Sequence, residues 1–345
     1  MEAIFYINGE WERKINMERN AVIFVTGGAG YIGSHICKVL SQNGFQPVVY
    51  DNLCSGNEEA VCWGPLIKGD IRDRNALRAA LEEHKPGAIM HFAALIQVGE
   101  SVAHPDIYYD NNVFGSWCLL EEARRVGVEN MVFSSTAAVY GMPQSSCISE
   151  VHPLRPINPY GHTKLAMENM IRDYADAYGL RYAILRYFNA AGADHDAETG
   201  TAYKVDTHII PLLMRVASGD KPQIGIFGTD YDTKDGTAMR DYIHVMDLAR
   251  AHVLSLRHIM EGKENLILNL GTDQGYSVRE VVESARRVTG KTIPAEETTR
   301  RAGDPDVLVA SALRAREVLD WNPEDSNLDT IMETAWRWRQ KQKGL

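Results

Sequence analysis

The most specific chemistry in this sequence comes from Tyr160 and Lys164, which follow Asn158-Pro159 and stand four residues apart. The segment 160–178 reads as a helix, and residues four apart on a helix share one face, with Cβ atoms about 5–6 Å apart. An ammonium about 4 Å from a phenol, at an effective dielectric constant of about 20, supplies roughly 4 kcal/mol, or about 3 pKa units. Burial opposes that shift, so the pair predicts a phenol with a pKa of roughly 7. Such a phenol can take a proton from a sugar or alcohol hydroxyl as hydride leaves the same carbon.

The same spacing also fits a core-facing tyrosine beside a solvated lysine, so other segments must decide between the two interpretations. One of them is the run FSSTAAVYG, which ends a strand roughly 25 residues before Tyr160. A hydroxyl at the carboxyl end of a strand, here that of Thr136, can hydrogen-bond a substrate oxygen beside the phenol. We therefore take Tyr160, Lys164 and Thr136 as the candidate catalytic residues.

Length and charge limit the class of protein. The 345 residues are 45% hydrophobic and 24% charged, as is ordinary for a globular enzyme, and no apolar run reaches the roughly 18 residues of a membrane-spanning helix. A net charge of −10 argues against nucleic acid or an anionic membrane as partner. The five cysteines form no CxxC pair and the first 20 residues lack a secretory apolar core, so we expect a cytoplasmic protein with no metal and no disulfide framework.

The elements that position these residues alternate between strand and helix. Residues 21–190 contain short β-branched runs separated by helical segments, which predicts an α/β fold with a Rossmann-type, doubly wound parallel sheet. After residue 190 the alternation loosens. We expect a smaller, interleaved substrate domain from 191–239 and 273–345, a segment 240–272 that rejoins the first domain, and an accessory extension at 1–20. The expected strands are 21–26, 47–52, 66–68, 88–92, 131–134 and 182–186, and the expected helices are 32–43, 74–84, 108–126 and 160–178.

A dinucleotide site is predicted at the first strand. The strand AVIFVT runs into Gly27-Gly28-Ala29-Gly30-Tyr31-Ile32-Gly33 and then a helix, an order that allows a tight turn, close approach of a pyrophosphate and contact with the helix N-terminus. Asp51 ends the second strand, where a carboxylate accepts from a ribose 2′-hydroxyl and repels a 2′-phosphate. No arginine follows in 52–57, so the sequence favours NAD over NADP.

Several longer segments identify a family. The chain resembles the extended short-chain dehydrogenase/reductases, and most closely their UDP-glucose (UDP-galactose) 4-epimerase branch, from about residue 21 to the region of 336–338. The segments that carry the resemblance are TGGAGYIGSH, GDIRD, HFAA with VGES, YYDNNV, FSSTAAVYG, NPYGHTK, LRYFNAAGA, FGTDYDTKDGTAMRDYIHVMDLA and RRAGD. The long block from FGTDY to MDLA is much more specific than the glycine loop.

The resemblance implies a non-dissociating NAD that takes hydride from C4 of a UDP-hexose while Tyr160 takes the 4-hydroxyl proton. The resulting 4-ketopyranose turns over and hydride returns to the opposite face, with no net oxidation. It also implies a homodimer formed by helices that flank the sheet. The cofactor contacts expected are Gly27, Gly30, Tyr31, Ile32, Gly33, Asp51, Asn52, Asp70, Ile71, Phe92, Ala93, Ala94, Asn111, Tyr160, Lys164 and Phe188. The substrate contacts expected are Thr136, Tyr160, Asn189, His208, Ile209, Gly225, Phe227, Arg240, Val278, Arg301 and Asp304.

The chain departs from the family pattern at four positions. Ile96 stands where many of these epimerases have a cofactor-contacting lysine, and Thr136 replaces the more usual serine. His208 stands at a frequent asparagine, and Leu308 at a tyrosine that often walls the sugar. A leucine at 308 leaves room for a bulkier 2-substituent such as N-acetyl.

Three alternatives remain open from the sequence. The enzyme could epimerise another UDP-sugar: an N-acetylated hexose, a uronate or a pentose. A nucleotide-sugar dehydratase would need an Asp-Glu pair after the active hydroxyl, where this chain has Ala137-Ala138. A non-catalytic NAD-binding protein would be expected to have lost Tyr160 or Lys164, and both are present.

Overall fold

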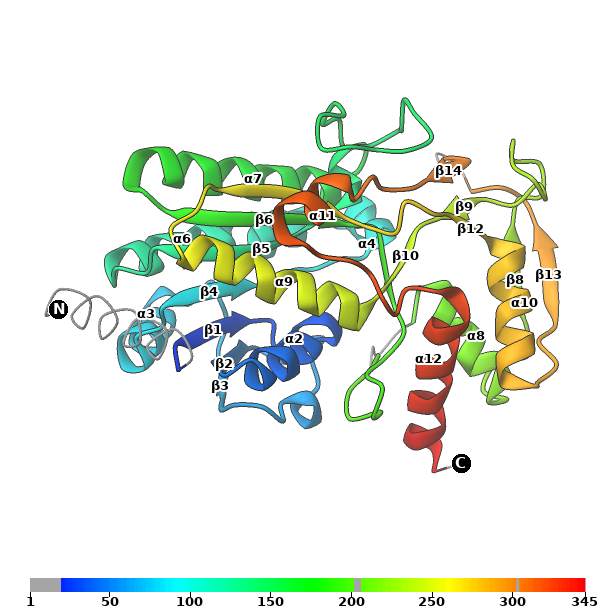
Figure 1. Cartoon of the computed structure of the whole chain (residues 1–345), viewed down its shortest axis with the longest axis horizontal. Helices are drawn as coiled ribbons and strands as arrows, with labels where there is room; N and C mark the ends of the chain where they lie inside the picture. The colour runs from blue at the N-terminus through cyan, green and yellow to red at the C-terminus, as the bar shows by residue number, and fades with distance from the viewer. Residues whose placement is uncertain (1–19, 202–205, 302–303, 345) are drawn as a thin grey trace, which may run out of the picture.

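A seven-stranded parallel sheet forms the centre of the molecule (Figure 1). The computed structural model describes residues 20–201, 206–301 and 304–344, so the predicted extension at 1–20 lies outside the described residues except for residue 20. The strand order is β11-β6-β5-β4-β1-β2-β3, and every pairing is parallel. This confirms the predicted Rossmann-type fold. The strands are β1 (Val22–Thr26), β2 (Gln46–Asp51), β3 (Leu66–Lys68), β4 (Ala88–His91), β5 (Asn130–Thr136), β6 (Arg181–Tyr187) and β11 (Leu266–Leu270).

The direction of winding reverses beside β1. The chain runs outward from β1 to β2 and β3, then returns to place β4 on the other side of β1. The register sets Thr26 level with Tyr50 and His91, so the turns that follow β1 and β4 leave the sheet at the same edge. In open parallel sheets the ligand cleft lies at the carboxyl ends of the strands where the winding reverses.

Two helical layers bury both faces of the sheet (Figure 1). Successive strand residues point to opposite faces, so Val25 and Val49 enter one core while Phe24 and Val48 enter the other. The first core is covered by α2 (Tyr31–Gln42), α9 (Val245–Met260) and α11 (Leu313–Leu319), and the second by α3 (Arg74–His84), α6 (Gly115–Arg125) and α7 (Pro159–Tyr178). Because both faces are covered, the strands are apolar almost throughout.

The stretch predicted as one helix over 108–126 is interrupted. It follows α4 (Val98–Ala103), and consists of α5 (Pro105–Tyr108), a π-helical segment η2 (Tyr109–Phe114) and then α6. The Asn112 side chain lies in the π-helical segment, accepts from the Leu95 amide at 2.8 Å and donates to the Leu95 carbonyl at 3.0 Å. Such local π turns are common at functional sites, and this one carries Asn111.

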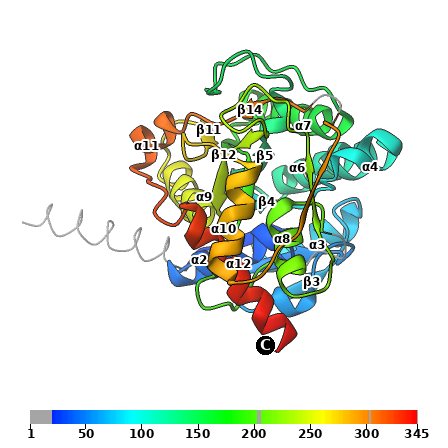
Figure 2. The same ribbon diagram turned by 90° about the vertical axis from the view of Figure 1, so that its right-hand side faces the viewer.

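A third, smaller core lies beyond the carboxyl ends of the strands (Figure 2). It is built by α8 (Ile209–Ala217), α10 (Val278–Thr289) and α12 (Leu328–Lys343). Ser277 starts α10 with a capping box in which its side chain and that of Glu280 satisfy each other's backbone amides. Short strands surround this core: β7 (Asn189–Ala191) with β10 (Tyr242–His244), β8 (Ile224–Phe227) with β13 (Ala295–Thr298), and β9 (Met239–Arg240) between β12 (Tyr276–Ser277) and β14 (Val307–Leu308).

The segment 240–272, which is expected to rejoin the first domain, contains two parts that behave differently. Residues 266–270 form its edge strand β11, beside β6. Residues 241–252 instead supply β10, which pairs with β7 in a separate sheet, and the first half of α9, which covers the main sheet. Throughout the described ranges, no helix combines the length and the apolar character needed to traverse a bilayer.

Candidate active site

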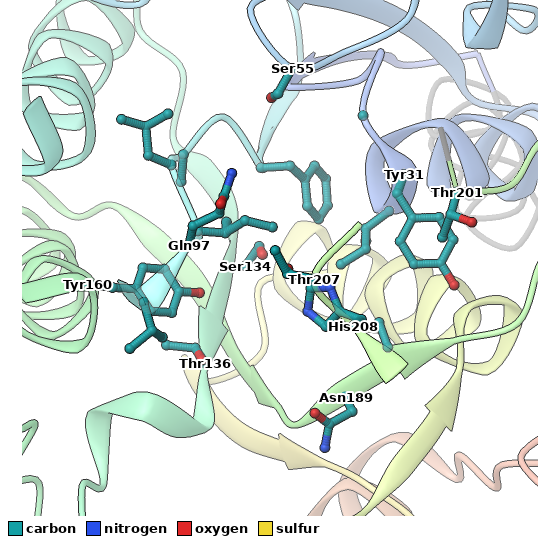
Figure 3. A pocket seen from close by; sticks show the side chains of 18 of the residues that line it. Tyr31, Ser55, Gln97, Ser134, Thr136, Tyr160, Asn189, Thr201, Thr207 and His208 are labelled. Atoms are coloured by element: carbon teal, nitrogen blue, oxygen red, sulfur yellow. The ribbon is translucent and has the colours of Figure 1, made fainter. Parts of the chain in front are cut away.

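A cavity of about 1090 Å³ lies at the carboxyl ends of the strands, between the main sheet and the third core formed by α8, α10 and α12 (Figure 3). Residues of β2, β5 and β6 and of the turns that follow β1 and β4 line its sheet side, and residues around α8 and α12 line the other. Tyr160 and Thr136 lie side by side at one end, while Tyr31 and Thr201 lie at the opposite end (Figure 3). The chain therefore brings its predicted cofactor and catalytic segments to one cavity.

The glycine loop needs glycine at two positions for different reasons. Gly27 has φ +73°, and a Cβ there would also lie 2.6 Å from the Ala93 amide nitrogen. A Cβ on Gly33 would lie 2.4 Å from the Gly27 carbonyl oxygen, so only glycine lets α2 pack this closely on the turn. The first residues of α2, Tyr31 and Ile32, line the cavity together with Gly27, Gly30 and Gly33. The backbone is thus shaped to receive a diphosphate at a helix N-terminus.

Asp51 is held at the end of β2 by backbone donors. The Ala29 amide donates to Oδ2 at 3.0 Å and the Leu53 amide donates to Oδ1 at 2.8 Å. Burial raises the pKa of Asp51, and these two amide hydrogen bonds oppose that effect. The carboxylate lines the cavity with acceptor capacity left for a ribose hydroxyl.

Asp70 does not line the cavity. Arg72 holds its carboxylate, with Nε 2.8 Å from Oδ1 and Nη2 2.7 Å from Oδ2, and this contact lowers the pKa of Asp70 below its usual range. Asn52 lines the cavity and donates to Asp70 at 3.0 Å. Asp70 therefore orients Asn52 here, while the other predicted cofactor residues of this end do line the cavity: Ile71, Phe92, Ala93, Ala94, Asn111 and Phe188.

The start of α7 fixes the catalytic end. Asn158 caps the helix by accepting from the Gly161 amide at 2.8 Å, and Pro159 takes the first helical position, where no amide donor is needed. The Thr136 hydroxyl hydrogen-bonds the Tyr160 phenol. Lys164 is buried on the same helical face, donates to the Ser134 carbonyl at 2.8 Å and lies over the Phe133 ring at 4.8 Å.

The predicted pKa of Tyr160 is wrong for this structure. Burial raises the pKa of Tyr160 to about 12, and the hydrogen bond from Thr136 only partly opposes it. Burial also lowers the pKa of Lys164 to about 7, against the attraction of Glu168. A pKa near 7 requires an ammonium directed at the phenol, but Lys164 is directed at a backbone carbonyl, and both the ammonium and the phenolate lose hydration on burial. A further positive charge in the cavity is needed to favour the phenolate.

The predicted substrate residues are divided between the cavity wall and the structure behind it. Asn189, His208, Arg301 and Asp304 line the cavity. Behind that wall, Arg240 donates to Asp304 at 2.5 Å, and Phe227 lies under the Arg301 guanidinium at 4.0 Å. The predicted residues outside the cavity wall are Ile209, Gly225, Phe227, Arg240 and Val278.

Several cavity residues carry no sequence signal that we used. Gln97, Met142 and Ile157 line the cavity, as does Leu308, which the sequence marks as a departure. At the far end, α8 contributes Met214 and Arg215, and α12 contributes Trp338 and Arg339. The C-terminal helix α12 and the start of α2 line the same cavity only because of the fold, so spacing along the chain could not have revealed these residues.

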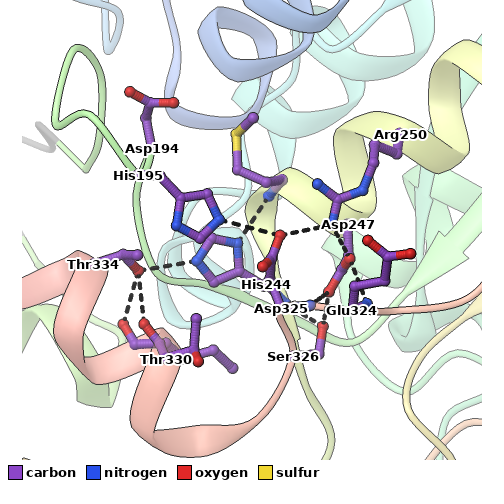
Figure 4. A network of polar contacts seen from close by, with 12 residues as sticks. Asp194, His195, His244, Asp247, Arg250, Glu324, Asp325, Ser326, Thr330 and Thr334 are labelled. Carbon is purple, nitrogen blue, oxygen red and sulfur yellow. Dashed lines mark hydrogen bonds and ion pairs between the residues drawn. The ribbon is translucent and has the colours of Figure 1, made fainter.

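Among the described residues, two clusters outside the cavity have side chains that could bind a metal, and the carboxylates of one of them all pair with Lys38. His195, His244 and Asp325 bring their ligand atoms within 4.8 Å of one another (Figure 4). However, His244 Nδ1 accepts from the Met246 amide at 3.1 Å, and its Nε2 lies 2.9 Å from the Thr334 hydroxyl. Asp325 bonds Arg250 at 2.6 Å. Both nitrogens of His244 are thus used, and the cluster joins α9 to α12 as a structural contact.

Comparison with known proteins agrees with this geometry. The chain belongs to the NAD dependent epimerase/dehydratase family, whose model matches residues 23–271. It is therefore an NAD-dependent enzyme of the epimerase class, which confirms the predicted cofactor. A UDP-glucose 4-epimerase from Rhizobium meliloti is 50% identical over 94% of this chain and 98% of its own, and one from Halalkalibacterium halodurans is 47% identical over 92% and 96%. The crystal structure of UDP-glucose 4-epimerase from Brucella ovis in complex with NAD has 50% identity and a TM-score of 0.90 over 92% of this chain and 98% of its own.

Proposed function

We propose that this chain is a UDP-glucose 4-epimerase, which interconverts UDP-glucose and UDP-galactose through a transient 4-keto sugar with bound NAD and no net redox change. The observation that carries the proposal is that Tyr160, Thr136 and Lys164 share one cavity with the glycine turn and Asp51. The sequence similarity to UDP-glucose 4-epimerases spans nearly the whole chain and supports the same conclusion.

The residues present fit NAD. The turn at Gly27 and Gly33 leaves the space that a Cβ would fill, and Asp51 offers carboxylate oxygens to a ribose. We assign the cofactor contacts to the predicted residues that line the cavity, with Asp70 orienting Asn52. When bound, the oxidised nicotinamide accepts hydride from C4 and adds the positive charge that favours a phenolate nearby.

In this proposal Tyr160 takes the proton of the sugar 4-hydroxyl and later returns it to the oxygen of the opposite epimer. The Thr136 hydroxyl bonds the same oxygen and keeps it beside the phenol. The Lys164 ammonium supplies a positive charge and a hydrogen-bond donor at the end of β5, where its bond to the Ser134 carbonyl fixes its direction. The dry surroundings of both groups strengthen each of these interactions.

The diphosphate of the substrate is assigned to Arg240 and Arg301. In a chain with a net charge of −10, permanently charged, forked donors are needed to bind it. Arg301 lines the cavity, and Arg240 lies directly behind it on Asp304. Asn189 and His208, which line the cavity, are assigned to the sugar and uridine parts of the substrate. The other predicted contacts, Ile209, Gly225, Phe227 and Val278, lie outside the cavity wall and are assigned no direct contact.

The test is product identification with the purified protein. Incubation with NAD and UDP-galactose should give UDP-glucose, approaching the same mixture from either sugar, with no accumulation of NADH. Stoichiometric NADH, or a dehydrated or decarboxylated sugar, would contradict the proposal and favour another reaction of the family.

A second substrate class is favoured by one residue. Leu308, on β14, lines the cavity where a tyrosine often stands, and a solved UDP-Glc/GlcNAc 4-epimerase from Campylobacter jejuni is 40% identical to this chain. We expect turnover of UDP-N-acetylglucosamine at a rate comparable with UDP-glucose. The variant Leu308→Tyr should lower turnover of UDP-N-acetylglucosamine roughly tenfold more than turnover of UDP-glucose, which is the size of effect expected when a few added atoms fill a pocket. Absence of any UDP-N-acetylglucosamine turnover by the natural chain would end this part of the proposal.

We further propose a cytoplasmic homodimer that serves galactose metabolism. Side chains on α5 and the following π segment leave apolar surface exposed, chiefly Ile107, Tyr109 and Phe114, and a second copy would cover it. All five cysteines are among the described residues and none of them forms a disulfide, which fits a reducing compartment. Light scattering on the purified protein tests the dimer, with Phe114→Glu as the variant expected to shift it to monomer.

The division into domains is likewise proposed. The first domain takes 21–190 and 240–272, because β11 and α9 join the main sheet and its cover. The substrate domain takes 191–239 and 273–345, which contain α8, α10 and α12 around their own core. Limited proteolysis should cut first between these parts, and cleavage within β1 to β6 before the junctions would contradict the division.

A further inference from the structure

The face of α7 that carries Tyr160 and Lys164 continues one turn further to a buried charge. Glu168 is 1% exposed and faces Arg186 of β6, which is 2% exposed. The pair is bidentate: Arg186 Nε donates to Oε1 at 2.9 Å and Nη2 donates to Oε2 at 2.6 Å. The Ser135 hydroxyl adds a third donor to Oε1 at 2.5 Å. A charge pair with this many bonds has a fixed geometry.

The three partners lie next to the catalytic residues along the chain. Ser135 and Arg186 are opposite one another in the register of β5 and β6, and the next pair in that register is Thr136 with Tyr187. Glu168 therefore binds both Ser135 and Arg186, the strand pair that precedes the cavity-lining pair Thr136 and Tyr187. Its own helix presents Lys164 one turn earlier, since residues four apart share a face.

A chain of hydrogen bonds leads from the Glu168–Arg186 pair to the segment 141–158. Arg186 Nη1 donates to the Tyr140 hydroxyl at 3.1 Å, and that hydroxyl donates to Asn269 Oδ1 at 2.6 Å. Asn269 Nδ2 in turn donates to the Ile148 carbonyl at 2.9 Å. Ile148 belongs to the segment 141–158, which lines the cavity with Gly141, Met142, Ile157 and Asn158.

We propose that Glu168 and Arg186 are positioning residues of the active site, which lock Lys164 and Thr136 in place and, through Tyr140 and Asn269, fix the segment 141–158 at the sugar end. Neither side chain lines the cavity, so each acts through its neighbours. The catalytic meaning of this network depends on the proposed function, but its effect on Lys164 and on the segment does not.

The charges around Lys164 determine how a change in this network would alter the pKa of Lys164. From α7 it faces Glu168 and the neutral phenol of Tyr160. From β4 it faces His91, which burial keeps neutral by lowering its pKa to about 3. From β6 the nearest charge is that of Arg186, held by Glu168. Within the described part of the chain, the Glu168 carboxylate is thus the one charge whose attraction favours the protonated form of Lys164 against burial. Its removal also leaves the Arg186 guanidinium unpaired, which disfavours the ammonium further.

The first test measures the pH at which Lys164 loses its proton in the cofactor-free protein. Competitive labelling of lysines with acetic anhydride across a pH series, read by peptide mass spectrometry, gives the midpoint at which Lys164 becomes reactive. In Glu168→Gln this midpoint should fall by at least about half a pH unit, because the stabilising charge is lost. Adding Arg186→Met to the same chain should bring the midpoint part of the way back, because the unpaired cation is gone.

Glu122 offers a matched control. It is fully buried on α6 and bonds Arg74 and Arg78 at 2.7 and 2.5 Å, but it does not line the cavity. Glu122→Gln should leave the Lys164 midpoint unchanged. An unchanged midpoint in Glu168→Gln, or an equal shift in Glu122→Gln, would overturn the proposal. Should Glu168→Gln fail to fold, the double variant decides alone: a midpoint below that of the natural chain supports the proposal, and an equal one overturns it.

The second test addresses the sugar end with Tyr140→Phe, which removes only the bridging hydroxyl. Hydrogen exchange of the segment 141–158 should become at least several-fold faster, while exchange in β1 and α2 stays unchanged. If the protein is an epimerase, kcat should fall with little change in KM. An unchanged exchange rate in 141–158 would overturn the link to this segment. Because labelling and exchange need no turnover, either result stands even if the proposed activity fails.

Discussion

The two ends of the cavity are built in different ways. The cofactor end consists of strand ends and one glycine turn, whose positions are set by the register of a parallel sheet. The substrate end consists of strands of two to four residues and loops, in which the candidate ligands bind each other. Arg240 holds Asp304, and Arg301 stacks on Phe227. The first end is therefore ready for its ligand, whereas the second must exchange internal contacts for those of a substrate.

This difference leads to separate expectations for affinity and turnover. A rigid site loses little conformational entropy on binding, which suits a cofactor that stays bound. A site whose arginines are already paired must break those contacts for each substrate molecule, which suits a ligand that has to leave. Changes at one end should therefore leave the binding at the other end intact.

The largest effect on ligand binding is expected from Gly33→Ala at the cofactor end. The added Cβ would lie 2.4 Å from the Gly27 carbonyl oxygen, a backbone atom that cannot move without opening the turn. Overpacking of this kind costs up to about 3 kcal/mol, or roughly 100-fold in NAD affinity if NAD binding must close the opened turn. Calorimetric titration with NAD checks it. Gly99→Ala in α4, where no heavy atom lies within 4 Å of the new Cβ, is the control and should bind NAD normally.

The junction between the two ends should show in the pH dependence of stability. The pKa of Lys164 is lowered to about 7 in the folded protein, so between pH 7 and its unfolded value of about 10.4 the unfolded state binds more protons. Stability should therefore rise with pH in this window, by about 2 kcal/mol between roughly pH 7.5 and 9.5, relative to Lys164→Met. Denaturant unfolding of both proteins at each pH gives the difference. Parallel curves would show that Lys164 is not buried as described.

A smaller and more selective effect is expected from Arg301→Met at the substrate end. Loss of one charge-assisted contact to a diphosphate is worth about 1.5 kcal/mol, so KM for the UDP-sugar should rise roughly tenfold. NAD binding should not change, because Arg301 belongs to the substrate end. A matched loss of NAD affinity would show that the two ends are not independent.

What the sequence could predict follows the same division. Gly27, Gly33 and Asp51 act within a few residues of their own strands, so their spacing was sufficient to place them, and it was sufficient for the α7 face that carries Tyr160 and Lys164. Asn111 was placed by resemblance, but the π-helical turn that carries it was not foreseen, because a helical pattern does not reveal where the hydrogen-bond ladder shifts.

The rest depends on contacts between distant segments. The direction of Lys164 toward the Ser134 carbonyl and the stacking of Arg301 on Phe227 each join residues at least 30 positions apart. The burial of the Tyr160 phenol likewise depends on how the fold surrounds it. The pKa of Tyr160 could not be predicted for this reason: the helical spacing gave the distance to a charge but not the loss of hydration. Trp338 and Arg339 entered the cavity from the C-terminal helix without any local signal.

The central claim is that the Tyr160 phenol exchanges the proton of the sugar 4-hydroxyl. Tyr160→Phe removes that oxygen and leaves the ring, and the most direct measurement is its epimerisation of UDP-galactose with bound NAD quantified in the same sample. We expect NAD content equal to that of the natural chain and a fall in kcat of about 10²- to 10⁴-fold, the contribution of one proton-transfer group. Full activity in a variant that retains its NAD would contradict the account.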